Sequence, residues 1–375
     1  MSAAHERLDA LRALQLPRPV RVMNVCGGHE RTISMAGLRT LLPDRIQLIP
    51  GPGCPVCVCP EEDIFQAIRL ALEERVIVAS FGDMLRVPVN VPRSAVRSLE
   101  QARAAGGDVR PIASPRDAVR IAREHPDRSV VFHAVGFETT LGPIAAMIEE
   151  GLPGNLSLLV SGRLTWPAVA MLLESEQPGF DALIAPGHVA TLMGPEEWAF
   201  VPRRHGIPAA IAGFTPDSIL DATLSVLRQW LDGRAELDNC YTAAARPGGN
   251  PVAQSALARC FEVVPAAWRG IGSIPGSGFA LQPHLAAHDA RRRFPACDDA
   301  ARRDAGKMPP GCDCARVVLG KIVPSECRIY GSPCTPRNPI GPCMVSDEGA
   351  CRIWWSSGIR ERSAPQRVAT PAALT

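Results

Sequence analysis

Cysteine is the residue type whose distribution most strongly suggests chemistry in this chain, because its 13 copies gather near the two ends. The N-terminal group comprises Cys26, Cys54, Cys57 and Cys59, and the C-terminal group Cys312, Cys314, Cys327, Cys334, Cys343 and Cys351. A chain of 375 residues that opens without an uninterrupted apolar signal segment does not need a disulfide framework, so metal binding or thiol chemistry is the better interpretation. We therefore expect two separate thiol sites.

The C-terminal motif is Cys327-x6-Cys334-x8-Cys343-x7-Cys351, among tight Pro and Gly turns, with a Cys312-x-Cys314 pair upstream. Four thiolates with irregular spacing favour a [4Fe-4S] cluster. A zinc site is the rival, although the paired knuckles of structural zinc are missing from this stretch. A third interpretation is that these are simply buried thiols, which behave as small hydrophobes. Cys312 and Cys314 could replace one or two of the four later cysteines.

Cys26 opens a loop, Cys26-Gly27-Gly28-His29-Glu30, between a predicted strand and a predicted helix. A thiol at a helix N-terminus, with an imidazole three residues on, has the setting that lowers the pKa of a cysteine. Cys26 could then bind iron or act as a nucleophile. In the alternative interpretation Cys26 is a core thiol and His29 a surface residue.

The motif Gly51-Pro52-Gly53-Cys54-Pro55-Val56-Cys57 contains the C-x2-C spacing of redox dithiols. Two thiols at this spacing can form a reversible disulfide. A second C-x2-C that would complete a zinc knuckle does not occur, so we favour an oxidisable dithiol over metal binding alone. Acidic residues directly after the motif, at 61–63, would oppose thiolate formation nearby.

The elements that must position these residues alternate short apolar runs with helical patterns from Val20 to about Gly213. This alternation predicts an α/β fold with parallel strands buried on both faces. Three pairs of segments echo one another in order: VMNVCGGHERT with VFHAVGFETT, LIPGPGCPVCV with LIAPGHVATLM, and VIVASFGDML with AAIAGFTPDSIL. We predict two similar α/β domains, at 1–118 and 119–235, and a helical, loop-rich iron-sulfur domain at 236–375. Loops at the carboxyl ends of the strands would form the ligand site.

Composition and charge exclude several classes of function. The formal net charge is +2 with no long basic run, which does not suggest a nucleic-acid partner. No apolar stretch is long enough for a membrane span, and we expect a cytoplasmic protein. Neither a Walker A motif nor a GxGxxG fingerprint occurs, so neither ATP nor a dinucleotide is indicated.

Five motifs, MNVCGGHERTI, IPGPGCPVCV, FHAVGFETT, APGHVATLMG and CTPRNPIGPCMVSDEGAC, closely resemble those of the HypD family of hydrogenase maturation factors. The resemblance implies two α/β domains and a C-terminal [4Fe-4S] domain. It also implies that the chain and the chaperone HypC hold iron while the Fe(CN)2CO unit of a nickel-iron hydrogenase is assembled, with cyanide delivered by HypE and supplied by HypF.

The same resemblance implies roles for individual residues. Cys26 would be the iron-holding thiolate with His29 as its neighbour, and Cys54 and Cys57 would be a redox dithiol that exchanges electrons with the cluster. Cys59 is additional to the family pattern, and its role is open. Two other functions stay in view: a [4Fe-4S]-linked thiol-disulfide reductase and a structural zinc protein.

Overall fold

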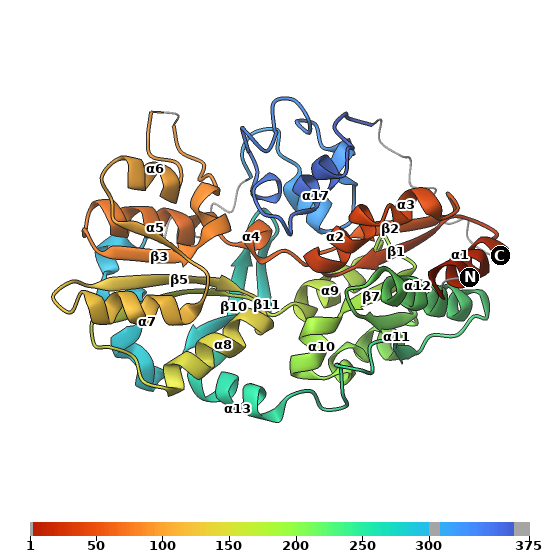
Figure 1. The fold of residues 1–375 in the computed structure, drawn as a ribbon, viewed down its shortest axis with the longest axis horizontal. Coiled ribbons are helices and arrows are strands. Elements are labelled where there is room, and N and C mark those ends of the chain that lie inside the picture. The colour runs from red at the N-terminus through yellow and green to blue at the C-terminus, as the bar shows by residue number, and fades with distance from the viewer. Residues whose placement is uncertain (1–2, 93, 300–307, 364–375) are drawn as a thin grey trace.

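The computed structural model describes residues 3–92, 94–299 and 308–363, in which nine parallel strands form two separate sheets (Figure 1). One sheet, called sheet A here, has the order β2 (Ile46–Pro50), β1 (Val20–Asn24), β7 (Ala182–Pro186), β8 (Ala209–Ala212) and β9 (Leu237–Asn239). The other, sheet B, has the order β4 (Val109–Ile112), β3 (Ile77–Phe81), β5 (Val130–Gly136) and β6 (Leu156–Gly162). Every pairing within these sheets is parallel, so the predicted α/β class is confirmed.

The chain crosses between the two sheets twice. Strands β1 and β2 lie in sheet A, the next four lie in sheet B, and β7 returns to pair with β1. Each sheet therefore takes strands from both predicted segments, 1–118 and 119–235, and the boundary between these segments does not separate the sheets. Apolar periodicity identifies buried strands, but it carries no information on which distant strand becomes the neighbour.

The two sheets share one arrangement of four strands, β2-β1-β7-β8 in sheet A and β6-β5-β3-β4 in sheet B. When the two orders are superimposed, β1 of sheet A corresponds to β5 of sheet B, and these are two strands whose sequences echo one another. The other two echoes do not match in position. For example, β2 is an edge strand whereas β7 is an interior strand.

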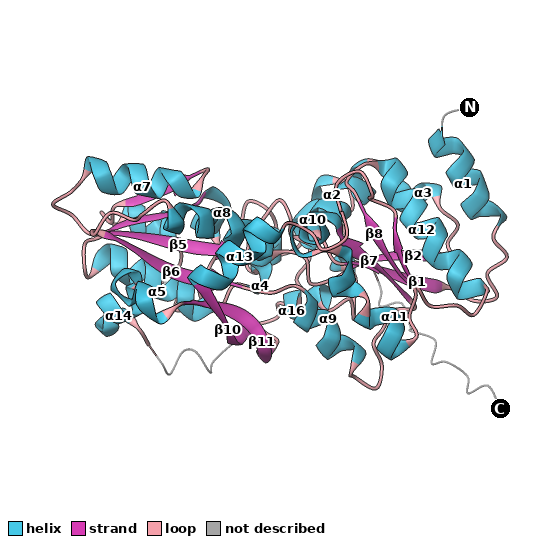
Figure 2. Cartoon of the chain, turned by 90° about the horizontal axis from the view of Figure 1, so that it is seen from below, coloured by secondary structure: helices cyan, strands magenta, loops and turns pink. Residues whose placement is uncertain are grey.

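Helices cover both faces of each sheet, which explains why strands such as β5 are buried along their whole length (Figure 2). The helices that precede or follow strands of sheet A are α1 (Ala3–Ala13), α2 (Gly27–Met35), α3 (Leu38–Leu41), α9 (Trp166–Leu173), α10 (Gly187–Met193), α11 (Phe200–His205) and α12 (Pro216–Leu231). Those next to strands of sheet B are α5 (Glu61–Leu72), α6 (Leu99–Ala104), α7 (Pro115–Glu124) and α8 (Glu138–Glu149). In the described part of the chain, no helix has both the length and the apolar character needed to cross a membrane.

Residues after 236 include an element that the sequence analysis missed. Helix α13 (Pro251–Cys260) packs on α8, and β10 (Phe261–Trp268) pairs with β11 (Gly272–Leu281) in an antiparallel hairpin. The expectation of a helical, loop-rich segment holds for α13 but is wrong for the hairpin at residues 261–281. Pro265 in β10, and Pro275 with three glycines in β11, interrupt the two strands and hide their alternation.

Helix α14 (Ala290–Arg293) packs beside β6, and the C-terminal cysteine-rich region that follows consists of short elements: α16 (Cys314–Val318), the 3-10 turn η6 (Pro342–Met344) and α17 (Ala350–Ser356). In Figure 1 this region, drawn in blue, lies above the junction between the two lobes. The short helix α4 (Pro55–Val58), on the first crossing between the sheets, contacts both α16 and η6. The crossing segment thus brings N-terminal and C-terminal cysteines together.

Candidate metal centre and thiol pocket

The loop that carries Cys26 is fixed by a close backbone approach. Cys26 is the N-cap of α2 in extended conformation, directly after β1. A Cβ on Gly53 would lie 2.3 Å from the backbone nitrogen of Cys26, and the Gly27 N–H donates to the Gly53 carbonyl at 3.0 Å. Only glycine at 53 allows this contact. The loops after β1 and β2 therefore behave as one unit.

Cys54 and Cys57 form a disulfide across α4. Cys54 is the N-cap of the helix, Pro55 occupies its first turn, and the Cys57 N–H donates to the sulfur of Cys54 at 3.2 Å. Both cysteines are buried. The third thiol of this segment, Cys59, takes no part in the disulfide and is completely buried, which, with the charge of Asp63, raises its pKa far above the ordinary value.

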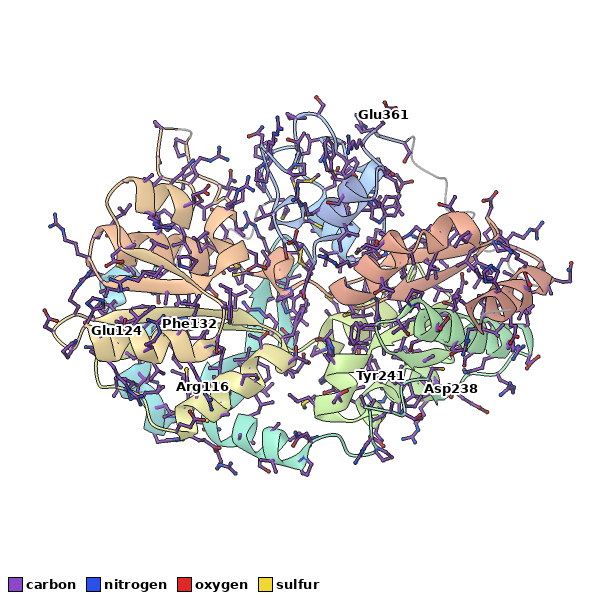
Figure 3. All side chains as sticks on the ribbon, viewed as in Figure 1. Arg116, Glu124, Phe132, Asp238, Tyr241 and Glu361 are labelled. Carbon is purple, nitrogen blue, oxygen red and sulfur yellow. A yellow bond between two sulfur atoms is a disulfide. The ribbon has the colours of Figure 1, made fainter. Side chains whose placement is uncertain are left out.

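One pocket joins these N-terminal thiols to the C-terminal group. Its lining includes Cys26, Cys54, Cys57, Cys343 and Glu348. Cys343 lies on η6, the turn that α4 contacts. A second hollow, lined by residues of α7 including Arg116 and Glu124, lies at the outer part of the sheet B side, and no cysteine lines it (Figure 3). The chemistry suggested by the sequence belongs to the first pocket.

Three C-terminal cysteines, Cys314, Cys343 and Cys351, have sulfur atoms within 4.8 Å of one another and are buried, so they could bind a metal. The thiols of Cys314 and Cys351 hydrogen-bond the sulfur of Cys343 and lower its pKa. Cys312 lies beside them, since its thiol hydrogen-bonds Cys314. Four sulfurs at one buried place are the donor set of a thiolate-ligated iron cluster.

Cys327 and Cys334 are not part of this sulfur triad, although both are buried. Cys334 stays close, because its sulfur accepts a hydrogen bond from the Ile340 N–H at 3.4 Å. A Cβ on the next residue, Gly341, would lie 2.4 Å from the sulfur of Cys312 and 2.6 Å from that of Cys314. Because Gly341 has no side chain, the sulfur atoms of Cys312 and Cys314 can lie beside its backbone.

Burial has a larger effect on the pKa of Cys26 than its position at the start of the helix. It raises the pKa of the Cys26 thiol to about 11, against hydrogen bonds from the backbone N–H groups of His29 and Gly28 that lower it, while Glu348 raises it further. The setting of the loop alone had suggested a lowered pKa. The protein environment outweighs the helix terminus because the thiolate loses hydration. A metal ion that displaces the proton would reverse this balance.

His29 points away from the thiol pocket. Its ring is fully buried, its Nε2 donates to the Ala212 carbonyl at 3.0 Å, and its Nδ1 has no partner among the described residues. Burial lowers the pKa of His29 to about 4. The ring lies 5.0 Å from Phe214, which stacks on the exposed His188. His29 therefore anchors α2 to β8, and it is not among the residues that line the pocket.

Glu30 is a buried residue that the sequence analysis did not single out. Its carboxylate accepts hydrogen bonds from Asn24 at 3.0 Å, Arg39 at 2.8 Å and the Trp354 indole at 2.7 Å. Trp354 lies on α17, which also carries Cys351. Glu30 thus ties the helix after Cys26 to the helix of a metal-centre cysteine. The only sequence signal was a carboxylate in the first turn of α2.

Comparison with known proteins gives one consistent result. Residues 2–358 match the family model described as "HypD: Hydrogenase formation hypA family". The chain is 41% identical over 362 residues to the hydrogenase maturation factor HypD of Azotobacter vinelandii, covering 94% of this chain and 93% of that protein. It is 40% identical over 352 residues to HypD of Rhizobium leguminosarum bv. viciae, covering 91% and 89%. With HypD of Cupriavidus necator it shares 38% over 374 residues, covering 95% and 93%.

Proposed function

The chain belongs to the HypD family of hydrogenase maturation factors, and on that premise we propose that it is the scaffold on which the Fe(CN)2CO unit of a nickel-iron hydrogenase is assembled. The iron is the substrate, and Cys26 is its ligand on this chain. A HypC-type chaperone shares the iron, and HypE delivers the cyanide groups. Thiolate is a soft ligand that suits iron carrying cyanide and carbonyl.

The observation that carries the proposal is the pocket that Cys26, Cys54, Cys57 and Cys343 line together. The proposed iron ligand, the disulfide-forming pair and one cysteine of the sulfur triad line the same pocket, although more than 280 residues separate Cys54 from Cys343 in the sequence. A [4Fe-4S] cluster held by Cys314, Cys343, Cys351 and one further cysteine, when bound, supplies single electrons. Cys312, Cys327 and Cys334 are the candidates for the further ligand.

Each protein group has a defined task in this proposal. Cys26 releases its proton as iron binds, because the metal stabilises the thiolate that burial disfavours. An external one-electron donor would supply two electrons in succession to the Cys54–Cys57 disulfide, which takes up two protons as its S–S bond breaks and two thiols result. His29 holds α2 in place through the Ala212 carbonyl and does not act as a ligand.

An anaerobic infrared spectrum of the protein with its HypC-type partner tests the scaffold function. Cyanide and carbonyl bands are expected for the wild-type complex, and the Cys26→Ala variant should lose them. Cys240→Ser is the matched control, since Cys240 is also a partly exposed free cysteine but lies outside the pocket. Bands that persist in Cys26→Ala would contradict the role of Cys26.

A second candidate is a [4Fe-4S]-linked thiol-disulfide reductase, which the contact of α4 with the Cys343 turn also favours. It predicts turnover of a generic disulfide in the absence of a HypC-type partner, whereas the scaffold predicts none. Metal analysis separates both from a structural zinc protein. Zinc at stoichiometry without a brown chromophore would support the zinc alternative.

A further inference from the structure

Arg269 lies buried in the turn between β10 and β11, with only 2% of its surface exposed. One guanidinium nitrogen, Nη2, donates to the Pro88 carbonyl at 2.6 Å. Its Nε and Nη1 have no hydrogen-bond partner among the described residues. No carboxylate within the described residues forms an ion pair with it, although the nearby buried Asp63 pairs with Arg291 at 2.8 Å.

A buried cation without a counter-charge is costly, by several kcal/mol even after relaxation of the surroundings. Natural proteins place such a charge where an anion or a metal centre compensates it. Because a carbonyl supplies only a dipole, the Pro88 contact alone does not neutralise Arg269. The compensating negative charge must come from another group near the turn.

The position of the turn identifies that group. The Arg269 N–H donates to the Val58 carbonyl at 3.0 Å, one residue beyond Cys57. A Cβ on the following Gly270 would lie 3.0 Å from the Cβ of Ala315, the neighbour of Cys314. The turn is therefore packed between the dithiol helix α4 and the first metal-centre helix, α16.

We propose that Arg269 is the fixed counter-charge of the iron-sulfur centre and raises its reduction potential. This inference rests on the proposed function. A [4Fe-4S] core of charge 2+ with four thiolates has a net charge of −2, and one added electron makes it −3. A nearby cation stabilises the more negative state more strongly, particularly where water cannot screen it. Arg269 thereby favours the cluster state that holds the electron for the dithiol.

A redox titration of the anaerobically purified holoprotein tests the charge directly. Arg269→Gln removes the charge and keeps hydrogen-bond donors for Pro88, while Arg269→Lys keeps the charge. The ratio of reduced to oxidised cluster at a fixed potential should fall about tenfold in Arg269→Gln, a shift of about 59 mV for a one-electron couple. Arg269→Lys should stay near the wild type. Equal potentials for Arg269→Gln and the wild type would overturn the inference.

A matched control comes from Arg328, which also lies beside a C-terminal cysteine but differs in environment. Its side chain is 67% exposed and pairs with Asp313 at 3.0 Å, so solvent and the carboxylate screen it. Arg328→Gln should shift the potential much less than Arg269→Gln. A shift of the same size from both variants would show a general charge effect and overturn the specific role of Arg269.

Thermal unfolding of protein with and without its cluster gives a second readout, which does not depend on electron transfer. Without the cluster, Arg269 is uncompensated, so Arg269→Gln should be at least as stable as the wild type. With the cluster bound, the wild type should be more stable than Arg269→Gln. If the cluster-free variant were much less stable than the cluster-free wild type, Arg269 would be a structural residue and the inference would fail. A wild-type protein that binds no cluster would instead refute the proposed function itself.

Discussion

Gly53 packs so closely against Cys26 that the loop after β1 and the loop after β2 share one backbone contact. A Cβ at residue 53 would lie 2.3 Å from the Cys26 nitrogen and 2.5 Å from its Cα. The distance between Cys26 and Cys54 is thus set by main-chain atoms, which do not adjust by rotating a side chain.

The Gly53→Ala substitution should therefore damage both stability and iron binding. Forcing a methyl group into this contact should lower the free energy of unfolding by about 1–3 kcal/mol. It should also reduce the iron bound at Cys26, because the two loops must separate. Urea unfolding and iron analysis measure these effects. Gly154→Ala is the control, since a Cβ there meets nothing within 4 Å. Unchanged iron binding in Gly53→Ala would show that the loop spacing is unimportant.

The two thiols of the reduced dithiol should differ in reactivity. The sulfur of Cys54 accepts the Cys57 N–H at 3.2 Å, which stabilises a thiolate at Cys54. After reduction, a short pulse of iodoacetamide should therefore label Cys54 several-fold faster than Cys57. Peptide mass spectrometry measures the two rates. Faster labelling of Cys57 would refute this assignment, and unfolded protein, in which both should react alike, is the control.

Glu30 lines the thiol pocket, and it should also be important for stability. Glu30→Ala leaves Arg39 and Trp354 without their acceptor in a buried position, which should cost about 3–5 kcal/mol. Denaturant unfolding measures the loss. Glu262→Ala, on the exposed side of β10, should change stability by less than about 0.5 kcal/mol. A similar small effect at Glu30 would mean that the carboxylate does not tie α2 to α17.

Local patterns in the sequence predicted the parallel α/β class correctly, because burial acts on neighbouring residues, but they missed the hairpin of β10 and β11. They did not predict that β1 pairs with β7, about 160 residues away, since strand pairing depends on the whole chain. For the same reason the sequence did not predict the contact of Glu30 with Trp354. The prediction of a low pKa for Cys26 was wrong, because the sequence indicates the start of the helix but not the burial of the thiol.

The sulfur triad of Cys314, Cys343 and Cys351 predicts which cysteines bind the cluster. Serine substitutions of Cys314, Cys343 or Cys351 should each lower cluster iron to near background, because their sulfurs lie within 4.8 Å of one another. Iron and sulfide analysis with the visible spectrum measures the content. Cys260→Ser and Cys297→Ser, at buried cysteines outside the triad, are the controls. If Cys314→Ser kept its cluster while Cys327→Ser and Cys334→Ser lost it, the set Cys327, Cys334, Cys343 and Cys351 would be correct.

His133 should make the protein sensitive to acid. It is fully buried on β5, and neither ring nitrogen has a hydrogen-bond partner among the described residues. Burial lowers its pKa to about 4, while Asp63 raises it and Arg291 lowers it. An unfolded histidine has a pKa near 6.5, so between these values the unfolded state binds one more proton. Stability should therefore fall as the pH drops from about 6.5 to about 4, by about 3 kcal/mol in total from this residue.

The His133→Leu variant isolates this contribution, since His29, with its similarly lowered pKa, remains in place. Leucine cannot take up a proton, so the loss of stability between about pH 7.5 and about pH 5 should be smaller than in the wild type. Urea unfolding at the two pH values measures it. His284→Leu, at an exposed position, should leave the wild-type pH dependence unchanged. If His133→Leu lost as much stability on acidification as the wild type, then the imidazole would be protonated in the folded protein, which requires a buried partner such as Asp63 to hold that charge.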